Sequence, residues 1–243
     1  MTASKADIIA RLQKDILPLQ GIKTGLNNTA LDKIIGPLKN AFPGNSFPIG
    51  AIHEFIAGGR EDVAVTSAFI AGIFAPLMQN GGVVIWIGSA HTIFPPGLKS
   101  FGIVPDKIIF IDLKKEKEML WTMEESLKCA GIAAVIGEIK ELNFTASRRL
   151  QLAVEKSQVT GFVIRNNPQS ITTTACVTRW KITALSSEFE DGLPGVGFPR
   201  WNVDLLKVRN GKPGNWQIEH SAGCFRHIYK LAVIPPQLQQ KTG

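Results

Sequence analysis

Between Gly50 and Asn166 the sequence alternates short apolar runs with longer amphipathic segments, and this alternation restricts the fold more than any other feature. Val83–Ile87 and Ile108–Leu113 are too short for buried helices, so they are predicted to be strands buried on both faces. Strands that alternate with helices form right-handed connections around a mostly parallel sheet. The predicted strands are 51–56, 83–87, 108–113, 133–136 and 161–165, and the predicted helices are 61–80, 114–130 and 145–156.

After Asn166 the pattern becomes typical of antiparallel strands. Asn210-Gly211 lies between two alternating runs, and this dipeptide strongly favours a hairpin turn. The predicted fold class is therefore α/β, with a mostly parallel central sheet and an antiparallel hairpin in the C-terminal part. The additional strands are predicted at 176–185, 201–208 and 216–220.

Both ends of the chain are predicted to lie outside the main domain. Ile8, Leu12 and Ile16 recur at helical spacing, which indicates an amphipathic N-terminal helical arm. This arm either packs on its own domain or docks on a neighbouring subunit. The C-terminal end is polar and is expected to fray. The predicted division is an arm and linker at 1–28, the main domain at 29–233 and a flexible tail at 234–243.

The composition narrows the possible classes of function. Cys129, Cys176 and Cys224 lie far apart, and the four histidines have no ligand spacing with them, so neither a disulfide framework nor a metal site is predicted. No stretch reaches the roughly 20 apolar residues of a membrane helix. The N-terminus lacks the apolar core of a signal peptide. A soluble, cytoplasmic protein without contact to a membrane is expected.

The segment after the first predicted strand has the position of a phosphate-binding loop but not its residues. Nucleotide-binding α/β proteins place a lysine and a hydroxyl there, which contact phosphate and Mg²⁺. Here Val63 and Ala64 stand in their place, and Glu61 and Asp62 put carboxylates where phosphate would lie. An ordinary helix capped by acidic residues, with no catalytic residue and no cofactor, is predicted. This degenerate phosphate loop comprises Gly58, Gly59, Arg60, Glu61, Asp62, Val63 and Ala64.

Several sequence blocks, in the same order, resemble the ImuA family of bacterial induced mutagenesis, and together they cover about residues 31–220. They are Leu120–Lys128, Arg148–Ala153, Gly161–Arg165 and Pro199–Trp216. Phe47–Gly50 resembles the segment that precedes the first strand of recombinases, and Glu54 resembles the residue that ends this strand. The resemblance implies a RecA-like core. Gly137 lies near the usual position of a Mg²⁺-binding aspartate, which argues further against ATPase activity.

The resemblance also implies a function. Members of the family act in the SOS-type DNA damage response, so a non-catalytic RecA-like adaptor in error-prone translesion synthesis is expected. The implied partners are an ImuB-like relative of Y-family polymerases, an error-prone replicative polymerase and a RecA filament. Two alternatives stay open: a cell-division inhibitor similar to SulA, and an ATPase with a divergent phosphate loop.

A first candidate surface follows from the net charge of +7 and from the recombinase resemblance. Positive charge favours contact with phosphate polymers, although it is not specific for them. In recombinases the strand that matches Gly161–Arg165 precedes a mobile DNA-binding loop. The alternative is that these residues merely solvate the edges of the sheet. The predicted contacts to single-stranded DNA are Arg165, Thr172, Thr173, Thr174, Arg179 and Lys181.

A second candidate surface is the predicted hairpin from Pro199 to His220. Tryptophan and arginine are enriched at interface hot spots, and the hairpin carries both with further cations. The alternative is that the alternation of Trp201, Val203 and Leu205 packs these side chains against the domain's own sheet. The predicted partner contacts are Arg200, Trp201, Lys207, Arg209, Lys212 and Trp216.

Overall fold

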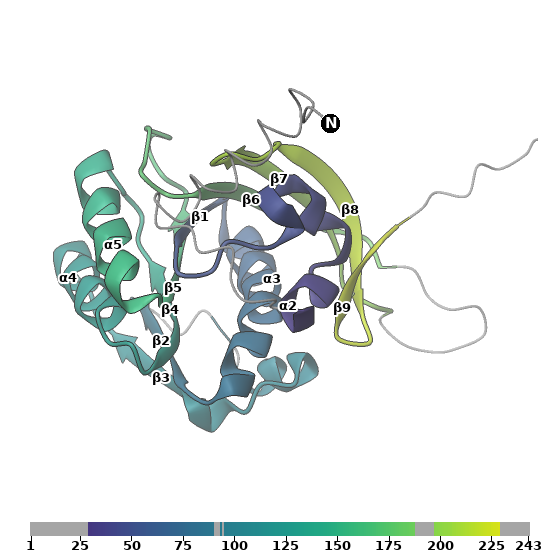
Figure 1. Ribbon diagram of the computed structural model, residues 1–243, viewed down its shortest axis with the longest axis horizontal. Helices are drawn as coiled ribbons and strands as arrows, with labels where there is room; N and C mark the ends of the chain where they lie inside the picture. The colour runs from purple at the N-terminus through teal and green to yellow at the C-terminus, as the bar shows by residue number, and fades with distance from the viewer. Residues whose placement is uncertain (1–28, 90–92, 94, 188–196, 229–243) are drawn as a thin grey trace, which may run out of the picture.

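The computed structural model describes residues 29–89, 93, 95–187 and 197–228, and these form a three-layered α/β domain (Figure 1). Its centre is a nine-stranded sheet with the order β3-β2-β4-β5-β1-β6-β7-β8-β9. The predicted N-terminal arm and C-terminal tail lie outside the described residues. The strands are β1 Ile52–Ala57, β2 Val83–Gly88, β3 Ile108–Asp112, β4 Ile132–Glu138, β5 Thr160–Asn166, β6 Thr178–Leu185, β7 Arg200–Val208, β8 Gly214–Ser221 and β9 Cys224–His227.

Helices cover both faces of the sheet. One face is covered by α4 and α5, which bury Met123 and Leu150 against the sheet in one apolar cluster. The other face is covered by α2 and α3, and the strands from β6 to β9 curve around α3 (Figure 1). Phe69 of α3 stacks there on Phe225 of β9, with ring centroids 5.0 Å apart. The helices are α2 Thr29–Ile34, α3 Arg60–Leu77, α4 Glu116–Leu127 and α5 Phe144–Ser157, and the 3-10 turns are Gly36–Ala41, Pro43–Asn45, Met78–Asn80, Pro95–Phe101 and Pro105–Lys107.

The mostly parallel sheet with an antiparallel C-terminal part is confirmed, but the change of direction comes one strand later than predicted. Strand β6 pairs in parallel with β1, so that His53 lies opposite Thr178, and only its other edge pairs antiparallel with β7. The prediction for β6 was wrong because the alternation of apolar and polar residues identifies a strand but does not show whether it runs parallel or antiparallel to its neighbour. Strand β9 was not predicted, because its four residues carry little periodic signal.

A connection without a helix joins β5 to β6. Both strands are parallel to β1 and lie on either side of it, so residues 167–177 must return across the sheet to the opposite end. The crossovers from β1 to β2, from β3 to β4 and from β4 to β5 each use an α-helix, whose backbone groups bond to one another. An extended connection has unpaired backbone groups that need side-chain partners. We call residues 167–177 the crossing segment.

Candidate functional site

The turn between β1 and α3 is closed by the protein's own side chains. The Asp62 carboxylate accepts a hydrogen bond from the Gly58 amide at 2.9 Å, in the place where a phosphate oxygen would accept one. Val63, which the sequence predicts in place of the usual lysine, is buried in the apolar core with 3% of its surface exposed. Glu61 and Asp62 lie in the first turn of α3 as predicted, but the helix begins after Gly59 and no side chain caps it, because Asp62 bonds to the amide that precedes the cap position.

The neighbouring strand ends offer little for metal or phosphate chemistry. A side chain at Gly137 would bring its Cβ within 2.7 Å of Met123 Sδ, so an aspartate there would require the Met123 side chain to move. The Glu138 carboxylate accepts a hydrogen bond from the Trp86 indole at 2.8 Å. Within the described ranges, no three His, Cys, Asp or Glu side chains come together as a metal site. Among these same residues, every helix is too short or too polar to cross a membrane.

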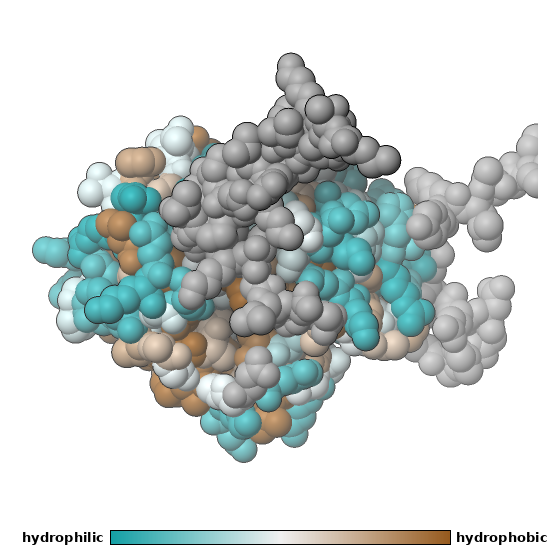
Figure 2. All heavy atoms as spheres, viewed as in Figure 1, coloured by the Kyte–Doolittle hydropathy of each residue, from teal (hydrophilic) through white to brown (hydrophobic). Residues whose placement is uncertain are grey.

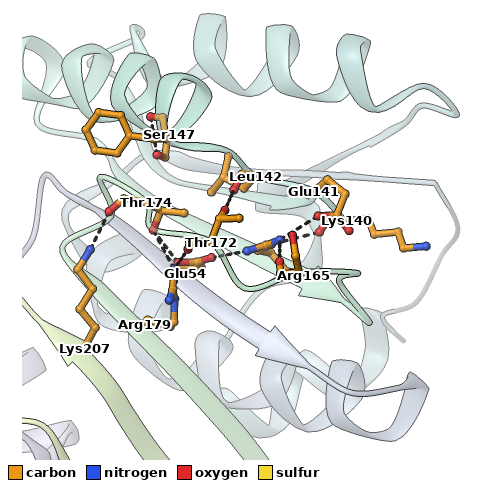
Figure 3. Close-up of polar contacts among 12 residues, drawn as sticks. Glu54, Lys140, Glu141, Leu142, Ser147, Arg165, Thr172, Thr174, Arg179 and Lys207 are labelled. Carbon is orange, nitrogen blue, oxygen red and sulfur yellow. Dashed lines mark hydrogen bonds and ion pairs between the residues drawn. The ribbon is translucent and has the colours of Figure 1, made fainter.

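A buried polar network lies below the crossing segment, and it centres on Glu54 of β1 (Figure 3). The fully buried Glu54 carboxylate accepts hydrogen bonds from Arg165 Nη1 at 2.9 Å, from Arg179 Nε at 2.9 Å and from Thr174 Oγ1 at 2.7 Å. Arg165 also pairs with the half-exposed Glu141 at 3.1 Å. A buried carboxylate with several charged and hydroxyl donors is stabilised, because each partner offsets its loss of hydration.

Arg165 and Arg179 of this network, together with Lys207 and Arg209, hold the crossing segment in place. Four backbone carbonyls of the segment each accept a hydrogen bond from a cationic side chain, and the Ala175 amide donates to Ser147 Oγ of α5 at 2.9 Å. The segment is thereby fixed to β5, β6, β7 and α5, in contrast to the mobile loop expected from recombinases. The four pairs are Ser170 with Arg165, Thr172 with Arg179, Thr174 with Lys207 and Ala175 with Arg209.

The pKa values of two groups beside the network, the Cys176 thiol and the Lys207 amine, are shifted by burial. Burial, reinforced by the Glu54 charge, raises the pKa of the Cys176 thiol to about 12, so the thiol is neutral and unreactive near neutral pH. Burial also lowers the pKa of Lys207, and the neighbouring Arg179 and Arg209 charges add to this effect. Lys207, Arg179 and Arg209 therefore lie close enough together at the crossing segment for their positive charges to repel one another.

Two predicted DNA contacts are corrected by this arrangement. Arg165 is completely buried and Thr174 is 2% exposed, because both side chains bond to Glu54 inside the protein. The Arg179 side chain is only 13% exposed. Thr172 and Thr173 are exposed on the crossing segment, and Lys181 is exposed on β6. Only these three predicted contacts are open to a ligand.

Three of the predicted partner contacts on the hairpin are likewise turned towards the protein itself. Trp201 is 3% exposed and packs edge-on against Phe69 and Phe225, with ring centroids 6.0 and 5.7 Å away, so it belongs to the core. Lys207 and Arg209 bond to the crossing segment. The remaining candidates are the exposed Lys212, the half-buried Trp216 and Arg200, whose guanidinium pairs with Glu219 at 2.8 Å.

The sheet order, the helix-free crossing segment and the β1–α3 turn define a RecA-like protein. Among solved structures, the chain resembles the KaiC-like protein PH0186 of Pyrococcus horikoshii OT3, with a TM-score of 0.52, 13% identity and coverage of 82% of this chain and 97% of that one. It also resembles the RadB recombinase, with a TM-score of 0.51, 12% identity and coverage of 76% and 94%. A more limited similarity, with a TM-score of 0.40 and 19% identity, relates 47% of this chain to 97% of SulA from Pseudomonas aeruginosa.

The chain belongs to the ImuA family. It is 32% identical over 207 residues to Protein ImuA of two strains of Caulobacter vibrioides, which covers 80% of this chain and 85% of each relative. No family model matches the sequence. The resemblance inferred from the sequence blocks is thus confirmed, and so is the RecA-like fold.

Proposed function

We propose that this protein is a non-catalytic RecA-like adaptor in damage-induced mutagenesis. It acts in the cytoplasm with an ImuB-like relative of Y-family polymerases and supports error-prone translesion synthesis. The family relationship supports the pathway. The single observation that supports a non-catalytic role is the hydrogen bond from the Gly58 amide to Asp62, because it places a protein carboxylate where a nucleotide phosphate would bind.

The proposal is tested by capture and by genetics. The purified protein should retain the purified ImuB-like partner, and deletion of its gene should abolish damage-induced mutations. Asp62→Asn should restore mutagenesis to a deletion strain as well as the original gene does, because no nucleotide needs to bind the turn. Unchanged mutagenesis in the deletion strain, or failure to retain the partner, would refute the adaptor role.

No measurable ATP turnover is expected from the purified protein, with or without single-stranded DNA. The turn offers neither a lysine nor a hydroxyl to the phosphates and Mg²⁺, and loss of one such electrostatic contact commonly costs about 10²–10³ in rate. Phosphate release measures this directly. Release that survives repurification and disappears in Glu61→Ala would support the alternative of an ATPase with a divergent loop.

Weak, salt-sensitive binding of single-stranded DNA is proposed for the exposed part of the crossing segment and Lys181. Because such binding rests on phosphate charge, Lys181→Gln should reduce the slope of affinity against salt by about one unit and leave sequence preference unchanged. Anisotropy of labelled oligonucleotides at several salt concentrations provides the measurement. Lys99→Gln, at another exposed lysine, is the matched control. An absence of binding at low salt would contradict this proposal.

A further inference from the structure

Helices α4 and α5 leave a groove between them on the outer surface, on the opposite face of the sheet from α3. The two helices lie side by side in Figure 1, and Figure 2 shows hydrophobic surface among hydrophilic side chains in this region. The groove has a volume of about 310 Å³, at the small end of ligand pockets, and suits one or two side chains. It is lined by Glu124, Lys128, Arg149, Leu152, Ala153 and Lys156.

The groove has an exposed apolar component. Leu152 is 48% exposed on α5, and Trp121 is 62% exposed on α4. Trp121 precedes Glu124 by three residues, so both side chains lie on the same face of the helix. By contrast, Trp86, Trp180 and Trp201 are buried in the core. Core packing therefore does not explain Trp121, whereas exposed tryptophan beside arginine is typical of interface hot spots.

The charge of the groove is positive. Its lining contains three cations and one carboxylate, that of Glu124. Glu124 pairs with Lys128 at 3.4 Å and with Arg149 at 2.5 Å, and Lys128 pairs more closely with Glu125 at 2.7 Å. The excess positive charge of the groove therefore comes from Lys156. No carboxylate among the described residues pairs with Lys156. Excess positive charge along an apolar floor favours a ligand that combines carboxylates with an apolar side chain.

We propose that this groove, which we call the α4–α5 groove, binds an acidic segment of a partner protein through one large apolar side chain. The apolar side chain packs on Leu152 and Ala153 beside Trp121, and flanking carboxylates pair with Lys156 and Arg149. A nucleic-acid backbone fits less well, because its phosphates gain nothing from the apolar floor of Leu152 and Ala153. The inference rests on the proposed adaptor function, since an adaptor requires a surface for its partner.

The test uses a phage-displayed library of random peptides, selected on the full-length protein, and fluorescence anisotropy of the enriched peptides. The enriched sequences should be acidic and contain a large apolar residue. Trp121→Ala should weaken their binding at least about 30-fold, the size of an interface hot spot. Lys156→Glu should weaken it up to about fivefold, as expected for an exposed ion pair. Both positions are exposed, so the melting temperature should not change.

Matched controls separate the groove from the rest of the surface. Leu152→Ala should weaken binding, whereas Leu206→Ala on β7, at an equal exposure of 48%, should not. Lys99→Glu is the control for Lys156→Glu. A selection without enriched peptides, enriched peptides that lack carboxylates, or equal binding to all variants would overturn the proposal. Binding of labelled oligothymidylate that is lost in the same groove variants would assign the groove to nucleic acid and also overturn it.

The two proposals fail in different ways. If the α4–α5 groove does not bind acidic peptides, capture of the ImuB-like partner and rescue of the deletion strain still test the adaptor role. If the adaptor role is wrong, mutagenesis is unaffected by deletion of the gene, whatever the groove binds.

Discussion

Glu54→Gln is expected to lower the free energy of unfolding by about 3–5 kcal/mol, a large part of the roughly 5–15 kcal/mol typical of a domain. Glutamine has a similar shape but no charge. Among the residues that the structure describes, the substitution therefore leaves the buried guanidinium of Arg165 with only the half-exposed Glu141 as an anion, and it leaves Arg179 without an anionic partner. Urea denaturation monitored by circular dichroism measures the change.

The control for this prediction is Glu118→Gln, which removes one partner of an exposed pair with Lys115. Such a pair contributes about 0–1 kcal/mol, so the midpoint of denaturation should hardly move. Hydrogen exchange gives a second readout, because the backbone amides of the crossing segment should lose protection in Glu54→Gln before the core strands do. Equal stability of the two variants would show that Glu54 is not the charge on which the crossing segment depends.

The regular part of the fold could be predicted because its elements depend on local patterns. Val83–Gly88 reads as a buried strand from its apolar run, and the Asn210-Gly211 turn identifies the β7–β8 hairpin. The parallel pairing of β6 with β1 could not be predicted, because it depends on where the crossing segment ends in space. No local pattern contains that information.

The site was predicted less well than the fold. Arg165 was predicted to contact DNA because of its charge and its place at the end of the strand that precedes the DNA-binding loop of recombinases, yet it is fully buried with Glu54. The signal that was overlooked is Glu54 itself. A carboxylate in the middle of the apolar strand Ile52–Ala57 requires a buried cationic partner.

The burial of the tryptophans could also be predicted only in part from the sequence. The alternation of Trp201, Val203 and Leu205 supports the core reading, which the structure confirms for Trp201. Trp121 is an apolar residue of the amphipathic helix α4, but it is 62% exposed. Helical periodicity places a residue on a face, whereas the neighbouring helix decides whether that face is covered.

Acid is expected to destabilise the protein through His53, and this is the second large effect. Burial lowers the pKa of His53 to about 3, partly offset by its hydrogen bond to the Pro48 carbonyl. Nε2 lies 2.8 Å from that carbonyl and must donate to it, so neutral Nδ1 accepts from Thr178 Oγ1 at 2.8 Å. Thr178 Oγ1 in turn accepts from the Trp180 indole at 2.6 Å. A proton on Nδ1 would bury a positive charge in the core and would force the Thr178 hydroxyl proton to leave its acceptor.

The free energy of unfolding decreases as the pH decreases when the unfolded state binds more protons than the folded state. In the unfolded chain His53 has its ordinary pKa of about 6.5, so between pH 6.5 and pH 3 the unfolded state binds a proton that the folded state does not. Stability is therefore fully present above pH 6.5 and falls as the pH decreases towards 3, by on the order of 5 kcal/mol in total and about 2 kcal/mol by pH 5. Between pH 7 and pH 5 most carboxylates stay ionised, which isolates the histidine contribution.

His53→Gln separates this effect from general acid sensitivity, because glutamine keeps a donor and an acceptor but does not titrate in this range. Urea unfolding at several pH values should give a clear loss of stability for the original protein between pH 7 and pH 5, and a nearly flat profile for His53→Gln, whatever its absolute stability. Burial also lowers the pKa of the half-buried His220, so His220→Gln should remove a smaller part of the slope. A profile that is equally steep with and without His53 would mean that another group senses the acid.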